Sequence, residues 1–415
     1  MLNILDSNLS INLKSKKDLT QAYDSFVESE HSFIHVLQNK NLWQVSGEFS
    51  SHLKDHFQEL VVIGIGGSHL GAESFVKALS FPRKVIFLEN PDPVGLTRRW
   101  NGIKNLSRTH FMFVSKSGGT FETLAIANWV IDKLKDSNLE ASKHCSVLTA
   151  KESSALKIWA DQTGAWCLKF PEDVSGRFSA LTPVGMLPLM FGLDKTMTDF
   201  FTEFFLGADS VLSSNLRGLK LMSIYNSLIQ DQFQTLNFWI YSDQMQGFGK
   251  WLRQLWSESL GQVNLPNSLS LPVFVLCKGA SDQHSYLQQA IAQSHKQVNF
   301  VLTLKKLNDD FTNHGLTKDH FKSSWGFENQ SFLDLFNDEA MGLVKTFKDL
   351  KIPYVHIEIE DVTLKSLVDF VLINQVVIAS LGQYLKINPF EQPQVEEMKK
   401  RISDLQKSKN KALLL

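Results

Sequence analysis

Short apolar runs alternate with helix-like segments along most of this 415-residue chain. In the first half, runs rich in β-branched and aromatic residues occupy Leu60–Ile65, Lys84–Leu88, His110–Val114, Cys145–Thr149 and Trp166–Phe170. Helix-like segments lie between them, at Gly71–Ser80, Glu122–Lys135 and Ser153–Thr163. Continuous apolar strands separated by helices are typical of a parallel sheet that is covered by helices on both faces. The pattern therefore predicts an α/β fold with mainly parallel sheets.

The same alternation of strand-like and helix-like segments occurs again after a helical connector near Phe200–Ser213. Strands are predicted at Asn237–Tyr241, Val273–Leu276, Val298–Leu304 and Tyr354–Ile359, and helices at Gly249–Leu260, His284–Ser294, Ser331–Leu350 and Thr363–Leu385. The polar stretch Leu307–Asn329 is predicted to be an excursion outside the second sheet. The layout indicates a helical N-terminal segment (1–45), a first α/β domain (46–200), a second α/β domain (201–386) and a helical tail (387–415).

Two glycine-rich segments follow predicted strands of the first domain. One is Ser115–Thr120, which offers three hydroxyls and two glycines just before a predicted helix. Free backbone N–H groups at a helix start, together with hydroxyls, bind anions such as a phosphate monoester. The other is Gly64–Gly71. Because ligands of parallel sheets bind beyond the carboxyl ends of the strands, we expect both segments to face one crevice.

The Gly64–Gly71 segment resembles a dinucleotide-binding fingerprint, but His69 stands where that fingerprint needs a third glycine. We interpret it instead as backbone that approaches a small ligand closely. Gly66 and Gly67 permit the approach and Ser68 supplies a hydroxyl.

Three further segments hold candidates for chemistry. Arg177, which follows Gly176 and lies among small polar residues in Ser175–Ser179, can stabilise a developing oxyanion. Glu258 shares a helix face with Gln254 amid apolar neighbours, which suits a general base. His284 follows a strand and is predicted to open a helix, as a proton donor or acceptor. Taken singly, each segment has an ordinary alternative: a Ser/Gly-rich turn, a surface arginine, a solvated glutamate, a turn histidine, or, for Lys399, a solvated helix face.

Composition narrows the function classes. A formal net charge of −1 leaves no broad basic field for nucleic acid or anionic lipid. Three widely spaced cysteines, without a Cys/His cluster, indicate a reducing cytoplasm and no structural zinc site. Residues Met1–Lys17 lack the apolar core of a signal peptide. Leu367–Leu385 carries Asp369 and other polar residues, so it is predicted to be a buried helix and not a membrane span.

Six motifs occur in one order along the chain: IGIGGSHLG, SKSGGTFET, GRFSALTPVG, QLWSESLGQ, GASDQHS and NPFEQPQVEEMK. In this set and order the chain resembles the glucose-6-phosphate isomerase (phosphoglucose isomerase) family, in its shorter bacterial form. The match runs from about Val61 to Lys399. The resemblance implies two sugar-isomerase (SIS) α/β sandwiches, and an enzyme of glycolysis and gluconeogenesis that interconverts glucose 6-phosphate and fructose 6-phosphate through a cis-enediol.

The resemblance also implies roles for individual residues. Ser115, Lys116, Ser117 and Thr120 would bind the phosphate, and Gly67, Ser68, Gln254 and Gln392 would contact the sugar phosphate. Glu258 would be the base, Arg177 would stabilise the enediolate, and Lys399 would assist ring opening. His284 would open the ring from a neighbouring subunit, which implies a homodimer with shared sites. Neither a metal nor an organic cofactor is implied, and neither a nucleic acid nor a membrane is an expected partner.

The chain departs from the family's usual motifs at Gln262, Asp282, Glu391 and Gln394, and none of these positions carries an assigned chemical role. Two alternatives stay open. One is a non-catalytic sugar-phosphate sensor on the same domains, which would need the phosphate segment without the acid–base residues. The other is an isomerase that also accepts mannose 6-phosphate.

Overall fold

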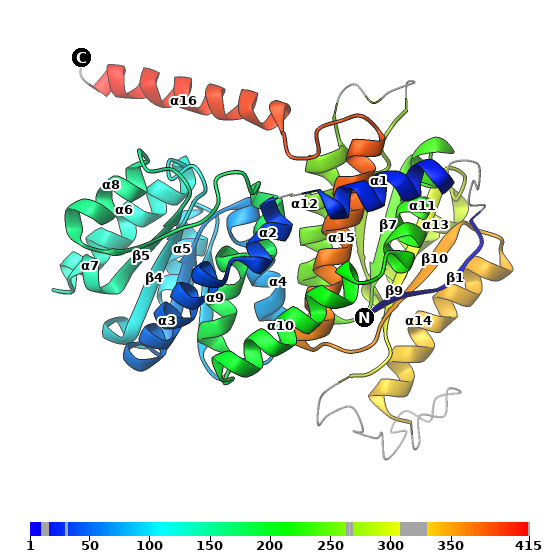
Figure 1. The fold of residues 1–415 in the computed structure, drawn as a ribbon, viewed down its shortest axis with the longest axis horizontal. Coiled ribbons are helices and arrows are strands. Elements are labelled where there is room, and N and C mark those ends of the chain that lie inside the picture. Colours follow the sequence, from blue (N-terminus) through cyan, green and yellow to red (C-terminus); the bar gives the residue numbers. More distant parts are fainter. Residues whose placement is uncertain (10–15, 30–31, 263–264, 266–268, 308–329, 414–415) are drawn as a thin grey trace.

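Two five-stranded sheets form the centres of two α/β lobes that lie side by side (Figure 1). The structure is a computed structural model, which describes residues 1–9, 16–29, 32–262, 265, 269–307 and 330–413. Nearly all of the expected excursion at Leu307–Asn329 lies outside the described residues.

The first sheet is entirely parallel, with the strand order β3-β2-β4-β5-β6. Its strands are β2 (Glu59–Ile63), β3 (Lys84–Leu88), β4 (Thr109–Val114), β5 (Cys145–Thr149) and β6 (Trp166–Lys169). Strands β2, β4 and β5 are buried along their whole length, as a sheet covered on both faces requires. The strands predicted for this domain are confirmed, with ends that move by one or two residues.

The second sheet has the order β1-β10-β9-β7-β8. Its strands are β1 (Leu2–Ser7), β7 (Thr235–Ile240), β8 (Val273–Lys278), β9 (Gln297–Leu304) and β10 (Tyr354–Ile359). All pairs are parallel except β1–β10. The N-terminal segment was expected to be helical, and for residues 2–7 this is wrong. Leu2–Ser7 is too short to signal its state by periodicity, and pairing with β10 together with burial of Leu2 makes it a strand.

Both sheets follow one plan. When the edge strand β6 of the first sheet and the edge strand β1 of the second are left out, each sheet has four strands. In both sheets these four strands are arranged in the same way: the strand that comes second in the chain lies at one edge, followed by the first, the third and the fourth (β3-β2-β4-β5 and β8-β7-β9-β10). In the first lobe the order reverses between β2 and β4, which is the position where open α/β sheets bind ligands. The two glycine-rich segments leave these two strands, so the topology brings them together.

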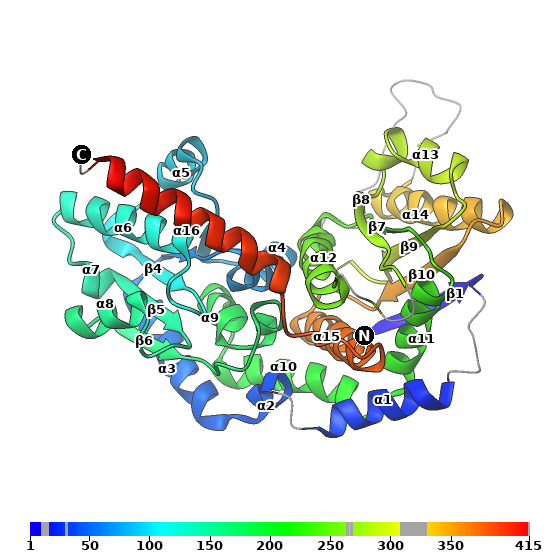
Figure 2. The same cartoon turned by 90° about the horizontal axis from the view of Figure 1, so that it is seen from above.

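Helices cover both faces of both sheets (Figures 1 and 2). In the N-terminal segment and first lobe they are α1 (Lys16–Glu28), α2 (Ser32–Gln38), α3 (Lys40–His56), α4 (Leu70–Ala78), α5 (Pro93–Trp100), α6 (Phe121–Asp136), α7 (Ala141–His144), α8 (Ala155–Thr163) and α9 (Pro183–Gly192). The remaining helices are α10 (Met197–Leu212), α11 (Leu216–Gln230), α12 (Gln246–Leu260), α13 (Leu287–Ala292), α14 (Phe332–Asp349), α15 (Leu364–Tyr384) and α16 (Pro393–Leu413). The predicted two-domain α/β architecture with a helical tail is confirmed.

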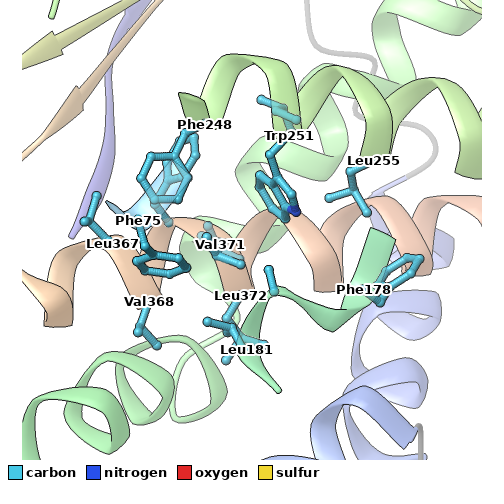
Figure 3. Packing of buried hydrophobic residues seen from close by; sticks show 14 of the residues in the cluster. Phe75, Phe178, Leu181, Phe248, Trp251, Leu255, Leu367, Val368, Val371 and Leu372 are labelled. Carbon is cyan, nitrogen blue, oxygen red and sulfur yellow. The ribbon is translucent and has the colours of Figure 1, made fainter. Parts of the chain in front are cut away.

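One continuous apolar core joins the inner faces of the two lobes, and Figure 3 shows its centre. Phe75 of α4 meets Phe248 of α12 edge to face, with ring centroids 5.1 Å apart. The helices approach so closely that a Cβ on Gly247 would lie 2.8 Å from the Cα of Ser74. Helix α15 is long and apolar enough to cross a membrane, but 94% of its apolar window is buried in this core. Close packing of this kind fixes the two lobes relative to each other.

His110, on β4, is held uncharged by burial. Its Nε2 lies 2.8 Å from Ser146 Oγ on β5, and the ring of Phe57 lies 4.9 Å away, centroid to centroid. Burial lowers the pKa of His110 to about 3, and repulsion from His144 and His52 acts in the same direction. The folded imidazole therefore stays neutral at pH values where the same group in the unfolded chain, with its ordinary pKa of 6.5, takes up a proton.

The stability contributed by neutral His110 is fully present above pH 6.5 and is lost as the pH falls towards 3. Between pH 7 and pH 5 the loss from this one group is about 2 kcal/mol. We therefore expect the fall in unfolding free energy between these pH values, measured with urea, to be about 2 kcal/mol smaller in His110→Gln. The exposed His295 is the control, since His295→Gln should keep the full fall. Equal falls in wild type and His110→Gln would contradict the assignment.

Candidate active site

The loop between β4 and α6 has the geometry of an anion site. Ser115 Oγ lies 2.8 Å from Thr120 Oγ1 and 3.4 Å from Ser117 Oγ, so the three hydroxyls gather at the start of α6. Thr120 is the N-cap residue of α6, yet its side chain does not cap the helix. The first-turn N–H groups of α6 therefore point out of the loop without a side-chain cap, where the helix dipole favours negative charge.

A tight glycine contact holds this loop in shape. Gly118 has a φ of +59°, and a Cβ there would lie 2.2 Å from Ser154 Oγ. Ser154 itself caps α8 by accepting a hydrogen bond from the Lys157 N–H. Only glycine allows both the left-handed backbone and the close approach. Ser154 was not predicted as a site residue. Its contact with Gly118, which depends on the fold, shows that it helps to shape the loop.

The glycine-rich segment Gly64–Gly71 packs against the turn that carries Arg177. Gly66–Ser68 forms a 3-10 turn after β2, and Gly176–Leu181 forms another after β6. A Cβ on Gly67 would lie 2.1 Å from the carbonyl carbon of Gly176, so the two backbones touch. Ser179 Oγ donates to the Gly67 carbonyl at 3.1 Å and fixes the contact. Ser179 belongs to the motif GRFSALTPVG but was not predicted as a site residue.

Arg177 is almost completely buried where the two lobes and the tail meet. Its Nε donates to Ser259 Oγ at 2.8 Å, and its Nη1 donates to Gln392 Oε1 at 3.0 Å and to Glu258 Oε2 at 3.4 Å. Burial lowers the pKa of Arg177, and Glu258 opposes that effect. The guanidinium therefore sits as a shielded cation against one oxygen of the Glu258 carboxylate.

Glu258 lies near the C-terminal end of α12, with part of its side chain open to solvent. Its other oxygen, Oε1, accepts a hydrogen bond from Gln254 Nε2 at 3.2 Å. Gln254 in turn meets the first glycine turn, since a Cβ on Gly66 would lie 3.2 Å from Gln254 Nε2. The structure thus brings Glu258, Gln254, Arg177 and Gln392 together beside the Gly66–Ser68 turn.

Lys116 adds a second cation next to the anion loop. Burial lowers its pKa, Glu172 and Asp173 raise it, and Arg177 is near enough to lower it further. The carbonyl of Lys116 accepts hydrogen bonds from the Ala150 N–H and from Thr149 Oγ1. Its backbone is therefore fixed, and its charge lies close enough to Arg177 to interact with it.

His284 does not reach this site within one chain. Helix α12 runs antiparallel to the strands beside it: Gln246 at its start contacts the end of β7, and Trp256 near its end contacts Pro272, just before β8. His284 follows the other end of β8, where its neighbour Gln283 contacts Tyr241. A 15-residue helix is about 22 Å long, so Glu258 and His284 lie at opposite ends of the second lobe.

The expectation that His284 opens a helix is corrected. His284 ends the 3-10 turn Ser281–His284, and α13 starts at Leu287. The turn begins after Ala280, whose φ of +54° is unusual for a residue with a side chain. Asp282 stabilises the turn, because its carboxylate accepts from the Lys278 N–H at 2.7 Å. His284 is exposed on this turn.

Lys399 pairs with Glu396 on its own helix at 2.6 Å. Glu396 in turn contacts the side chain of Gln392. Helix α16 extends from the tail across the first lobe and packs closely on no other element among the described residues (Figures 1 and 2). The tail therefore delivers Gln392 to the site and links Lys399 to Gln392 through Glu396.

The assembled groups define what the site can do chemically. A carboxylate that is tied at both oxygens and lies beside a buried guanidinium can move a proton next to a developing oxyanion. The hydroxyl loop offers an anchor for a phosphate. Within the described part of the chain, no group of three or more His, Cys, Asp or Glu side chains is arranged to hold a metal ion.

Comparison with known proteins places these features in a family. A family model described as phosphoglucose isomerase matches residues 26–412. A probable glucose-6-phosphate isomerase from Methanococcus maripaludis is 27% identical over 96% of this chain and 92% of its own length. A glucose-6-phosphate isomerase from Mycoplasma capricolum is 28% identical over 87% of this chain and 86% of its own.

A solved structure shows the same fold. The glucose-6-phosphate isomerase from Chlamydia trachomatis superposes with a TM-score of 0.80 at 19% identity, covering 99% of this chain and 88% of that one. At this identity the likeness concerns the fold alone.

Proposed function

The chain belongs to the phosphoglucose isomerase family, and we propose that it interconverts glucose 6-phosphate and fructose 6-phosphate at the site around Glu258. The observation that carries the proposal is the Glu258–Arg177–Gln392 cluster beside the Gly66–Ser68 turn. In this cluster the Glu258 carboxylate, which would act as the base, and the Arg177 cation lie together at the junction of the two lobes, near the Ser115–Thr120 loop. The family and its named relatives make the enzyme an isomerase of sugar phosphates.

The phosphate group would occupy the start of α6, held by Ser115, Ser117, Thr120 and backbone N–H groups, with Lys116 adding charge. Gly67 and Ser68, on the neighbouring turn, would contact the sugar. Binding energy from the phosphate, which does not react, would position the C1–C2 bond against Glu258.

The proton transfer would run through Glu258. Its carboxylate would take the proton from C2 of the aldose and return it to C1, or the reverse, through a cis-enediol. Arg177 favours the negative charge of that intermediate, and Gln254 orients the second carboxylate oxygen. Gln392 would contact the substrate from the tail.

His284 would open the sugar ring in the site of a partner subunit. The separation of His284 from Glu258 within one chain supports a homodimer in which each site takes Glu258 from one chain and His284 from the other. Lys399 would assist ring opening from the tail, where Glu396 links it to Gln392.

A mixing experiment tests the shared site. Glu258→Gln and His284→Gln chains should each be inactive as homodimers, but a hybrid dimer keeps one intact site, with Glu258 and His284 on different chains. Random re-association of equal amounts gives half hybrids, so activity should recover to about a quarter of wild type. If both residues act within one chain, mixing restores nothing. Light scattering of the wild type should give the mass of a dimer.

The enzyme would act in glycolysis and gluconeogenesis in the cytoplasm. The three cysteines, Cys145, Cys167 and Cys277, are all free, which supports a reducing compartment.

The assay that tests the function follows conversion of fructose 6-phosphate to glucose 6-phosphate with a coupled dehydrogenase. Saturable isomerase activity supports the proposal. A folded protein that binds fructose 6-phosphate without converting it would overturn the proposal in favour of a sugar-phosphate sensor. Adding mannose 6-phosphate as substrate tests whether the second epimer is also accepted.

A further inference from the structure

Every N–H donor of Arg177 is already used inside the protein. A guanidinium has one N–H on Nε and two on each Nη. The Nε bond goes to Ser259, and the two Nη1 bonds go to Gln392 and Glu258. Nη2 donates to the carbonyls of Pro389 at 2.7 Å and Glu391 at 2.9 Å. The orientation of Arg177 is therefore set as much by the turn at 388–392 as by the catalytic carboxylate.

Asn388 organises this turn. Its Oδ1 accepts a hydrogen bond from the Phe390 N–H at 3.1 Å, which is the geometry of an Asx turn. Its Nδ2 donates to Glu391 Oε1 at 2.8 Å. Its carbonyl accepts from Gln262 Nε2 at 2.6 Å, which ties the turn to the end of α12, four residues beyond Glu258.

Apolar contacts also hold the 388–392 turn in place. Pro389 is buried and lies so close to Gly382 of α15 that a Cβ there would be 2.8 Å from the Cβ of Pro389. The ring of Phe390 lies 5.0 Å from Phe178, the residue next to Arg177. The turn is thus fixed on one side by α15 and on the other by the segment that carries Arg177, with Asn388 setting its internal shape.

Two departures from the family's usual motifs, Gln262 and Glu391, both contact Asn388. Gln262 supplies an N–H to its carbonyl, and Glu391 supplies an acceptor to its side chain. These two positions therefore have a shared structural role in this chain.

We propose that Asn388 is a positioning residue, which shapes the 388–392 turn so that its two carbonyls orient Arg177 towards Glu258 and Gln392. Asn388 touches no group that would react, and it acts through Arg177. Gln262, just beyond the end of α12, supports it through the hydrogen bond to its carbonyl. The expected effect on kcat rests on the proposed function. The expected effect on the shape of the turn rests on the contacts of Asn388 alone.

The test compares Asn388→Ala with Asn388→Ser. Alanine removes the acceptor for the Phe390 N–H, whereas serine keeps a neutral hydroxyl acceptor and brings no second negative charge beside Glu391. We expect Asn388→Ala to lower kcat about tenfold, because loss of orientation weakens the transition state more than the ground state, with KM changed less than about twofold. Asn388→Ser should return kcat to within about threefold of wild type.

A second readout needs no catalysis. Backbone amide exchange over residues 385–393, measured by mass spectrometry, should become faster in Asn388→Ala and return towards wild type in Asn388→Ser. Asn128→Ala is the matched control. Asn128 is an exposed helix asparagine whose Nδ2 donates to the Leu124 carbonyl at 2.9 Å, far from the turn in sequence, so neither readout should change.

Unchanged exchange in Asn388→Ala would overturn the assignment, and so would faster exchange with an unchanged kcat. A parallel fall in both variants would also contradict it, because the Asx-turn acceptor is then not the feature that matters. If wild type shows no isomerase activity, the proposed function fails, and the exchange comparison alone decides whether Asn388 shapes the turn.

Discussion

Replacing Glu258 with glutamine is expected to lower kcat by at least about 1,000-fold while KM stays within about threefold of wild type. Glutamine keeps the shape of the side chain and an oxygen that can accept from Arg177, which contacts Glu258 Oε2 at 3.4 Å. It cannot take up a proton from carbon. Because a general base acts in the transition state more than in substrate binding, the loss should fall on kcat.

The control for this result is Glu48→Gln on α3. Glu48 is an exposed helix glutamate whose Oε1 accepts from Gln44 four residues earlier, the same local arrangement that Gln254 and Glu258 have on α12. Its replacement should leave both constants unchanged. A rise in KM as large as the fall in kcat for Glu258→Gln would identify Glu258 as a binding or structural residue and would remove the base from the mechanism.

Gly67→Ala should reduce kcat/KM by about 100-fold or more, although it adds a single methyl group. That methyl would lie 2.1 Å from the carbonyl carbon and 2.3 Å from the carbonyl oxygen of Gly176. Both neighbours are backbone, so neither side can turn away by changing a rotamer. The Gly66–Ser68 turn and the segment leading to Arg177 must separate, and displacement of a catalytic group by about 1 Å can cost about 100-fold.

Steady-state kinetics with fructose 6-phosphate, together with a thermal unfolding curve, measures this effect. Gly342→Ala on α14 is the control, because a Cβ there meets nothing within 4 Å. That variant should keep full activity and gain a little stability from reduced freedom of the unfolded chain. Wild-type kinetics in Gly67→Ala would mean that the two turns are not in contact in solution.

Much of the first lobe could be predicted from the sequence because its strands are buried on both faces. Runs such as His110–Val114 and Cys145–Thr149 are mostly apolar, and every residue of the strands that they form, β4 and β5, is buried. The strand order also places the Ser115–Thr120 loop and the Gly66–Ser68 turn side by side at the switch point, as expected from the parallel arrangement.

The strand β1 was missed because six residues carry too little periodic signal to outweigh the helical segments that follow. Its state depends on pairing with β10, more than 340 residues later in the chain. The start of α13 was misplaced for a related reason. Local propensity does not reveal the 3-10 turn at Ser281–His284, which is held by the contact of Asp282 with the Lys278 backbone.

The candidate site divides in the same way. Motif residues Glu258, Gln254, Arg177 and Gln392 were named from the sequence, and the structure brings them together. Ser259, Ser154 and the carbonyls of the 388–392 turn were not, because a buried hydroxyl or a backbone oxygen has no sequence signature of its own. The roles given to His284 and Lys399 stay predictions that depend on a partner subunit and on the position of α16.

The sequence by itself determined the α/β class and the plan of two mainly parallel sheets, because these follow from local patterns of burial, and its short motifs named the groups that we propose to react. Only the tertiary structure decided which of those groups share one site. Glu258 meets Arg177 because α12 runs antiparallel to β7 and brings its C-terminal end to the lobe junction, and the same geometry carries His284 to the far end of the lobe. Distances between segments far apart in the chain are set by packing of whole helices and sheets, which no local pattern contains.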